Sequence, residues 1–314
     1  MRSIAYSFLL VFMLSACTPA VPQKTSINTV TPSVRIAATI FPLASFAQHV
    51  GGAHVAVSQT IPSGAEPHDY EPTAKHIAAI ADADLFIMNG FGIDPWATDI
   101  RTERERDGKR TVSAAEVIFG QGGMNGGIAD KDVVNDPHLW LSPKNAKKIA
   151  EALFAQLIAI DPPHATDYTK SLLGFTLSIA ELDEAYRTGL SQCAKNTVIV
   201  SHDAYRLLAA EYGFKTVSIA GFSTEEEPSA RRLREISDLA REQRIGYILS
   251  EAGAGTDRVR ALASDLGASL LPLHPVEWLT QEEVASGKTY FSIMRDNLAS
   301  FRTAVGNKSS AYCN

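Results

Sequence analysis

The 314 residues include 45% hydrophobic and 20% charged side chains. This balance allows substantial buried cores, and the length predicts two domains. The formal net charge of -6 comes without any cluster of Lys and Arg along the sequence. The basic footprint that nucleic-acid binding requires is therefore missing. Composition thus argues against a disordered chain and against nucleic acid as a partner.

The first 17 residues predict an export signal. Arg2 supplies the positive start, residues 4–14 are almost continuously apolar, and the segment closes with Leu14-Ser15-Ala16-Cys17. Small residues before a cysteine resemble the lipobox of bacterial lipoproteins, which implies that a lipidated Cys17 anchors the chain in a membrane. The alternative is an ordinary signal peptide that leaves a soluble protein. Both interpretations place the chain outside the cytoplasm, in a periplasm or at a cell surface.

Residues 18–33 predict a flexible tether, because they combine three prolines with Ser and Thr and have few large apolar side chains. Two cysteines follow it, Cys193 and Cys313. In an oxidising compartment such a pair is a candidate disulfide. The alternative is two unpaired thiols.

Residues 34–163 predict an N-terminal α/β lobe. Strand-like runs at 34–40, 55–61 and 85–88 alternate with helical segments at 43–50 and 72–83. This order implies a parallel sheet with helices on its faces. Five glycines in residues 120–127 predict a surface loop, and a helix over 143–160 follows, with Ser142 as its expected N-cap.

A long helix is predicted over 164–190. At about 1.5 Å per residue it reaches roughly 40 Å, long enough to bridge two lobes rigidly. Residues 191–314 predict a second α/β lobe, with strands at 197–201, 216–219, 247–250 and 269–273, and a final amphipathic helix over 290–305. We expect the chain to be a monomer.

Four of the eight histidines follow predicted strands or precede helices: His68, His138, His202 and His274. Loops that leave the carboxyl ends of parallel strands line the ligand crevice, so these side chains are expected to converge. Imidazole nitrogen suits Zn²⁺, and a closed site takes four protein ligands. A single loop histidine is more often a solvated or capping residue. Three prolines beside these histidines, however, preorganise the loops.

Three ordered motifs carry a family resemblance, which extends over residues 35–305. They are Ser63-Gly64-Ala65-Glu66-Pro67-His68-Asp69-Tyr70-Glu71-Pro72-Thr73, then Asp136-Pro137-His138-Leu139-Trp140-Leu141-Ser142-Pro143, and Ser201-His202-Asp203-Ala204-Tyr205. The chain resembles the zinc and manganese receptors of ABC transporters, the ZnuA-like family. The resemblance implies two α/β lobes, each with a mostly parallel sheet flanked by helices. One long rigid helix joins the lobes, and the metal lies in the cleft between them.

Carried over by position, the resemblance implies His68, His138 and His202 as metal ligands. Manganese receptors of the family tend to place a carboxylate at the third position, so His202 favours zinc. At the fourth position many relatives have Asp before Pro-Leu-Gly, whereas this chain has His274-Pro275-Val276-Glu277. Either His274 completes the site, or water or Glu251 takes that place.

Residues near the expected ligands have two interpretations each. Asp69, Asp203 and Glu251 are candidates to orient the ligand imidazoles through their second nitrogen, although Asp69 and Asp203 are equally suited to turns and helix caps. Trp140 either walls the site or is simply part of the core.

The expected function is an extracytoplasmic receptor that captures Zn²⁺ and delivers it to the permease and ATPase of an ABC transporter. Two alternatives stay open: a Mn²⁺ receptor of the same family, and a metal-free adhesin or scaffold lipoprotein. An enzyme is not expected, because four protein ligands leave no open position for water. The sequence also lacks the His-Glu-x-x-His and Gly-x-Ser-x-Gly motifs.

Overall fold

The computed structural model describes residues 31–120, 136–191, 195–222, 227–251 and 256–306. The predicted export signal, the tether up to residue 30, most of the glycine-rich loop, Cys193 and Cys313 lie outside these residues. Ser33, which the sequence assigned to the tether, already contacts the fold, because its backbone N–H donates to the carbonyl oxygen of His54 at 2.9 Å. None of the helices in these ranges has the length and apolar character needed to cross a membrane.

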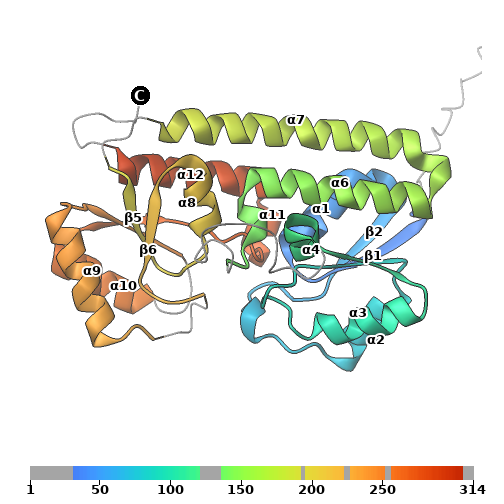
Figure 1. Ribbon diagram of the computed structural model, residues 1–314, viewed down its shortest axis with the longest axis horizontal. Helices are drawn as coiled ribbons and strands as arrows, with labels where there is room; N and C mark the ends of the chain where they lie inside the picture. Colours follow the sequence, from blue (N-terminus) through green and yellow to red (C-terminus); the bar gives the residue numbers. More distant parts are fainter. Residues whose placement is uncertain (1–30, 121–135, 192–194, 223–226, 252–255, 307–314) are drawn as a thin grey trace, which may run out of the picture. The chain divides into compact units, whose positions relative to one another are not determined.

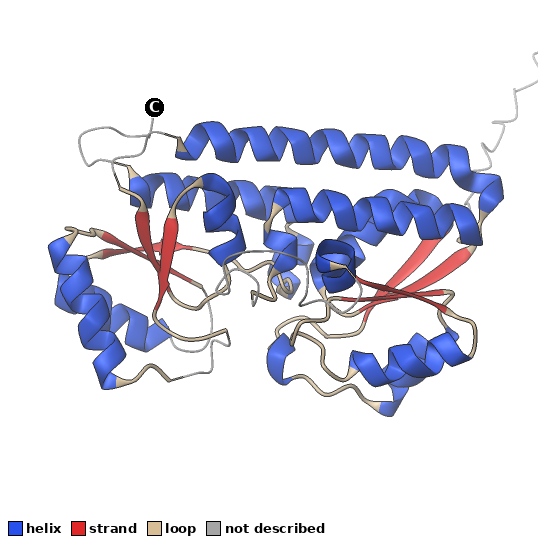
Figure 2. Ribbon diagram, in the orientation of Figure 1, coloured by secondary structure: helices blue, strands red, loops and turns tan. Residues whose placement is uncertain are grey.

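The N-terminal sheet is parallel, and its strand order is β2-β1-β3-β4 (Figures 1 and 2). Strand β3 is an uninterrupted apolar run whose residues are all buried, as is typical of a parallel strand covered on both faces. The elements are β1 (Val34–Ala38), α1 (Phe41–Gly51), β2 (Val55–Gln59), α2 (Ala74–Asp82), β3 (Leu85–Met88), α3 (Ala97–Arg106), β4 (Arg110–Ser113) and α4 (Ala114–Phe119).

The C-terminal sheet repeats this topology with the order β6-β5-β7-β8. Its elements are β5 (Thr197–Val200), α8 (Arg206–Tyr212), β6 (Lys215–Ser218), α9 (Ala230–Glu242), β7 (Tyr247–Ser250), α10 (Thr256–Leu266), β8 (Ser269–Pro272), α11 (Gln281–Ala285) and α12 (Tyr290–Val305). In each sheet the first strand in sequence lies between the second and the third. The chain therefore reverses its winding there, which is where open α/β sheets bind ligands.

Alternate strand residues face opposite helical layers. In β1, Ile36 and Ala38 belong to the large core that includes α1, whereas Ala37 packs in a separate cluster with α2 and α3. In β5, Val200 joins the large core, and Ile199 packs with α9 and α10. Each sheet is therefore covered on both faces.

Two helices connect the sheets. Helix α6 (Pro143–Ile160) begins at Ser142, whose hydroxyl accepts from the backbone N–H of Asn145, and α7 (Ala165–Leu190) extends for 26 residues, about 40 Å. Helix α7 packs against α1, α6 and α12 (Figure 1). The predicted two-lobe α/β fold and the long connecting helix are confirmed, whereas the residue boundaries between the domains stay a prediction.

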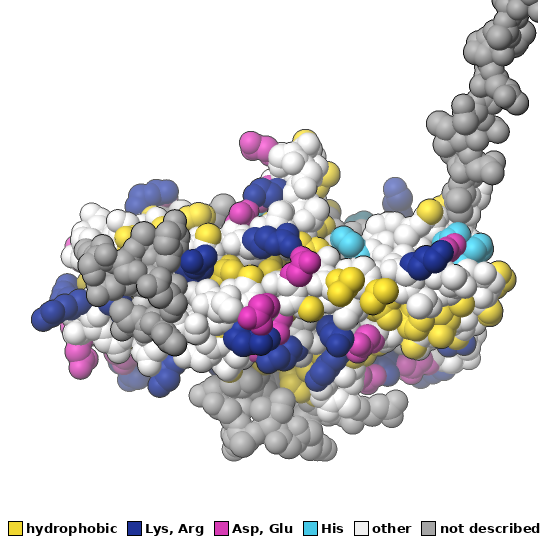
Figure 3. Space-filling model, turned by 90° about the horizontal axis from the view of Figure 1, so that it is seen from above, with side chains coloured by type: hydrophobic (Ala, Val, Ile, Leu, Met, Phe, Trp, Pro, Cys, Tyr) yellow, Lys and Arg dark blue, Asp and Glu magenta, His cyan; other side chains and the backbone are white. Residues whose placement is uncertain are grey.

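The two lobes share one hydrophobic core along α7. Phe46 of α1 contacts Phe175 of α7 and Tyr290 of α12, with ring centroids 5.4 and 4.8 Å apart. Moving one lobe against the other would break these contacts, so the packing favours a fixed arrangement. On the α7 side of the molecule, Figure 3 shows acidic and basic side chains interspersed among the described residues, without a continuous basic patch.

Arg104 of α3 is a buried cation that holds backbone carbonyls. It is 3% exposed, and its guanidinium donates to the carbonyl oxygens of Ile80, Ala83 and Arg110 at 2.5 to 3.2 Å. Each hydrogen bond from a charged donor contributes about 1.5–3 kcal/mol. We expect Arg104→Met to lower the free energy of unfolding by about 3 kcal/mol and the melting temperature by roughly 6–12 °C, measured by calorimetry.

The matched control is Arg106→Met, at an exposed position of the same helix, which should melt like the unmodified protein. Equal melting temperatures for the two variants would contradict this role for Arg104.

Candidate metal centre

His138 lies immediately before a short 3-10 helix, η3 (Leu139–Leu141), and its side chain is fully buried. One carboxylate oxygen of Asp136 accepts from both the backbone N–H of His138, at 2.9 Å, and its ring Nδ1, at 2.8 Å. A ring nitrogen that donates to a carboxylate carries the proton, so the neutral imidazole has its lone pair on Nε2. Nε2 is therefore the nitrogen of His138 that can bind a metal ion.

Two further ligand-bearing side chains meet His138. One ligand atom each from His68, His138 and Glu277 lies within 4.8 Å of the other two, and Nε2 of His138 is 3.2 Å from a carboxylate oxygen of Glu277. His68 Nε2, His138 Nε2 and Glu277 Oε1 are all buried and make no well-aligned hydrogen bond, although the last two face each other. An unsatisfied buried polar atom costs about 1–3 kcal/mol, and three at one point fit a site built for a cation.

His202 follows β5 and adjoins this group. It is 1% exposed, and its ring centroid is 5.4 Å from that of His138. Its Nδ1 lies 2.7 Å from a carboxylate oxygen of Glu251, although not in the direction of a well-aligned hydrogen bond. The structure thus brings three of the four predicted histidines together, from loops of both lobes.

The electrostatics of the group keep His68 neutral and Glu277 ionised. Burial, together with the charge of His138, lowers the pKa of His68 to about 4. Burial also acts to lower the pKa of His138, but the carboxylates of Asp136 and Glu277 outweigh it and raise this pKa to about 10. A metal ion that binds Nε2 must therefore displace the proton from that nitrogen. Burial acts to raise the pKa of Glu277, yet the neighbouring histidines, first His138, lower it. The carboxylate therefore stays ionised.

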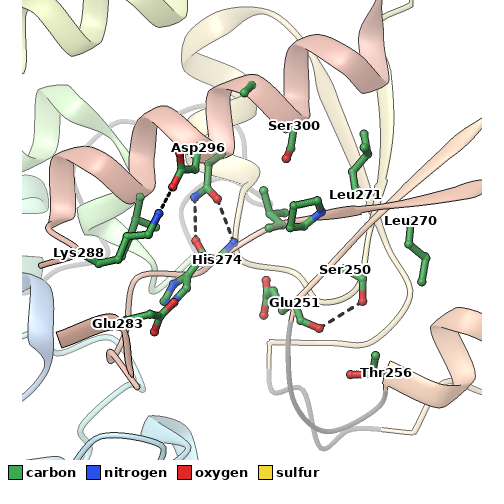
Figure 4. A pocket seen from close by; sticks show the side chains of 15 residues that line it. Ser250, Glu251, Thr256, Leu270, Leu271, His274, Glu283, Lys288, Asp296 and Ser300 are labelled. Carbon is green, nitrogen blue, oxygen red and sulfur yellow. Dashed lines mark hydrogen bonds and ion pairs between the residues drawn. The ribbon is translucent and has the colours of Figure 1, made fainter. Parts of the chain in front are cut away.

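The structure does not bring His274 into this group, which consists of His68, His138 and Glu277. Its Nδ1 accepts from the backbone N–H of Val276 at 2.8 Å, and its Nε2 faces Glu283 at 3.4 Å. Because Nδ1 is an acceptor, the neutral ring carries its proton on Nε2, and neither nitrogen has a free lone pair for a metal. His274 instead lines a cavity of about 700 Å³ beside α12, which Glu251 also lines (Figure 4).

Glu277 reaches the centre because the loop after β8 turns sharply. Val276 has a φ of 64°, a left-handed conformation that is rare for a β-branched residue. Two donors from the N-terminal lobe hold this loop: Trp140 Nε1 donates to Pro275 O at 2.7 Å, and Phe41 N donates to Glu277 O at 3.0 Å. The turn directs Glu277 to the metal centre and leaves His274 outside it.

The residues that were predicted to orient or enclose the ligand histidines differ in where the structure places them. Glu251 does lie beside His202, but Asp203 instead accepts from Arg206 Nε at 2.7 Å. Trp140 lines the site and also belongs to the hydrophobic core, because it is fully buried and its ring centroid is 5.4 Å from that of His138. Asp136, the carboxylate that orients His138, was not predicted from the sequence, although its place two residues before His138 was a usable signal.

Two parallel α/β lobes, one helix that joins them and a buried nitrogen and oxygen donor set from both lobes define a two-lobe binding protein for a single metal ion. The chain belongs to the family described as "Zinc-uptake complex component A periplasmic", whose model matches residues 36–304.

Curated relatives agree with this membership. The chain is 33% identical to the "High-affinity zinc uptake system protein ZnuA" of Bacillus subtilis, over 98% of this chain and 97% of the relative. It is 30% identical to the "Zinc-binding lipoprotein AdcA" of Streptococcus pneumoniae, again over 98% of this chain, but it spans only 62% of that relative's length.

Solved structures share the fold. The Zn(II)-bound ZnuA-like domain of Streptococcus pneumoniae AdcA superposes with a TM-score of 0.75 at 31% identity, over 88% of this chain and 100% of that one. The laminin-binding protein Lmb of Streptococcus agalactiae, described as bifunctional with adhesin and metal-transporting activity, has the same TM-score at 28% identity, over 87% of this chain and 99% of that one.

Proposed function

We propose that the chain is the extracytoplasmic receptor of a zinc-uptake ABC transporter. It captures Zn²⁺ with His68, His138, His202 and Glu277 and delivers the ion to a permease driven by an ATPase. The observation that carries the proposal is that His68, His138 and Glu277 bring ligand atoms within 4.8 Å of one another, and that each of these side chains has a buried nitrogen or oxygen without a well-aligned hydrogen bond. His202 supplies the fourth ligand from the adjoining loop.

The ligand chemistry favours zinc over manganese. Three imidazole nitrogens and one carboxylate form a four-coordinate set of the kind that Zn²⁺ accepts, whereas Mn²⁺ prefers more oxygen ligands. Four protein ligands leave no position for an activated water, which argues for a receptor and against a hydrolase. Membership of the zinc-uptake family supports the same function.

The proposed receptor works outside the cytoplasm, at the membrane that holds its permease. A lipidated Cys17 would hold a monomer at the membrane, close to the permease. The lipoprotein names of relatives such as AdcA support this anchor. The likeness to Lmb, which combines adhesin and metal-transporting activity, supports adhesion alongside metal transport and gives no support to the metal-free adhesin.

Metal analysis of the purified chain tests the proposal. We expect about one equivalent of zinc by mass spectrometry, and none in a variant with His68, His138 and His202 changed to alanine. Binding at 100 times Kd adds about 2.7 kcal/mol of stability, so zinc should raise the melting temperature by roughly 5–10 °C, and only in the unmodified protein.

Each alternative has its own result in that experiment. Tighter binding of manganese in competition would overturn the zinc assignment, and failure to bind either metal after titration would overturn the receptor. Hydrolysis of an ester or peptide panel by the zinc-loaded chain would favour an enzyme.

A further inference from the structure

A buried tyrosine contacts the carboxylate that faces His202. The hydroxyl of Tyr205 donates to Glu251 Oε1 at 2.8 Å, while Oε2 of the same carboxylate is the atom 2.7 Å from His202 Nδ1. Tyr205 is fully buried and Glu251 is 6% exposed. Glu251 therefore connects two residues: one oxygen contacts Tyr205, which is not a metal ligand, and the other contacts His202 of the metal centre.

The same stretch of chain also contacts the other orienting carboxylate. Two residues after Tyr205, the backbone N–H of Leu207 donates to Asp136 Oδ2 at 3.1 Å, and Asp136 Oδ1 holds His138. The beginning of α8 is thus hydrogen-bonded to both carboxylates that contact ligand imidazoles, one from each lobe. The position of this end of α8 therefore affects how the imidazoles of His138 and His202 lie relative to each other.

We propose that Tyr205 is a positioning residue for zinc capture, acting through Glu251. Its hydroxyl restrains the carboxylate so that Oε2 stays beside His202 Nδ1. A carboxylate at that place favours the ring proton on Nδ1 and leaves the lone pair of Nε2 for the metal. Without the hydroxyl, Glu251 is free to rotate away, and His202 is free to adopt the other tautomer. This inference rests on the proposed function, because it assigns Tyr205 to the same site.

The chain supplies a closely matched control. Tyr186 is also fully buried, and its hydroxyl also makes one hydrogen bond of 2.8 Å, to Met294 O between α7 and α12. Tyr205→Phe and Tyr186→Phe each remove one buried hydroxyl and keep the ring, so both should lower the melting temperature by similar amounts. A purely structural role would give the two variants the same zinc affinity.

The experiment measures zinc Kd by competition with a chelating dye in the full chain. Outer partners of metal ligands typically contribute about 10–100-fold to metal affinity. We expect Tyr205→Phe to weaken zinc binding about tenfold and Tyr186→Phe to change it less than twofold. The visible absorption of bound Co²⁺, which reports ligand geometry, should change in the first variant only.

A double-mutant cycle tests whether Tyr205 acts through Glu251. In a Glu251→Gln background, Tyr205→Phe should cause no further loss of affinity, whereas independent effects would multiply. Equal zinc affinities and Co²⁺ spectra for the Tyr205 and Tyr186 variants, or multiplied effects in the cycle, would overturn this inference while leaving the receptor proposal intact. Failure of the unmodified chain to bind zinc would overturn the receptor proposal itself.

Discussion

Glu277→Gln should weaken zinc binding by roughly a hundredfold to a thousandfold. Zinc sites with four protein ligands bind with about 10–16 kcal/mol, so one ligand contributes about 2.5–4 kcal/mol, and each 1.4 kcal/mol is tenfold in Kd. The substitution keeps the shape of the side chain but replaces an ionised oxygen, 3.2 Å from His138 Nε2, with a neutral amide. Titration with a competing chelator measures the loss.

His274→Asn is the control that separates the two candidates for the fourth position. An Asn side-chain oxygen can accept the Val276 N–H as Nδ1 of His274 does, so the turn is kept while the imidazole is removed. We expect zinc affinity within about threefold of the unmodified protein. A large loss in His274→Asn together with a small one in Glu277→Gln would restore the prediction made from sequence and reject the site assigned from the structure.

The fold was predictable because hydrophobic runs and their order determine it. Strand β3 is apolar throughout and α7 carries buried residues at helical spacing, and both signals are local in the sequence. His68 follows β2 and His202 follows β5, so the order of the elements placed both after the carboxyl ends of parallel strands, where open α/β sheets bind ligands.

The fourth position was not predictable in the same way. His274 and Glu277 are three residues apart in one loop, and the pattern alone favours the imidazole. The choice depends on the left-handed backbone at Val276 and on two hydrogen bonds from the other lobe, donated by Trp140 and Phe41. These are long-range contacts that spacing along the chain does not encode.

Asp136→Asn should weaken zinc binding about 10–100-fold, as expected for an outer partner of a metal ligand. The carboxylate accepts three N–H groups, two from His138 through Oδ1 and one from Leu207 through Oδ2. An amide has one oxygen and one NH₂, so one side must place a donor against a donor. If the NH₂ faces His138, the ring proton moves to Nε2 and blocks the metal; if it faces Leu207, the contact with α8 is lost.

Asp203→Asn is the matched control for Asp136→Asn, measured by the same dye competition. Asp203 is also buried, 4% exposed, and lies beside a ligand in the sequence, but its carboxylate accepts from Arg206. Because no ligand imidazole depends on that contact, zinc affinity should stay within about threefold. Similar losses in the two variants would mean that negative charge near the centre, rather than the tautomer of His138, is what Asp136 contributes.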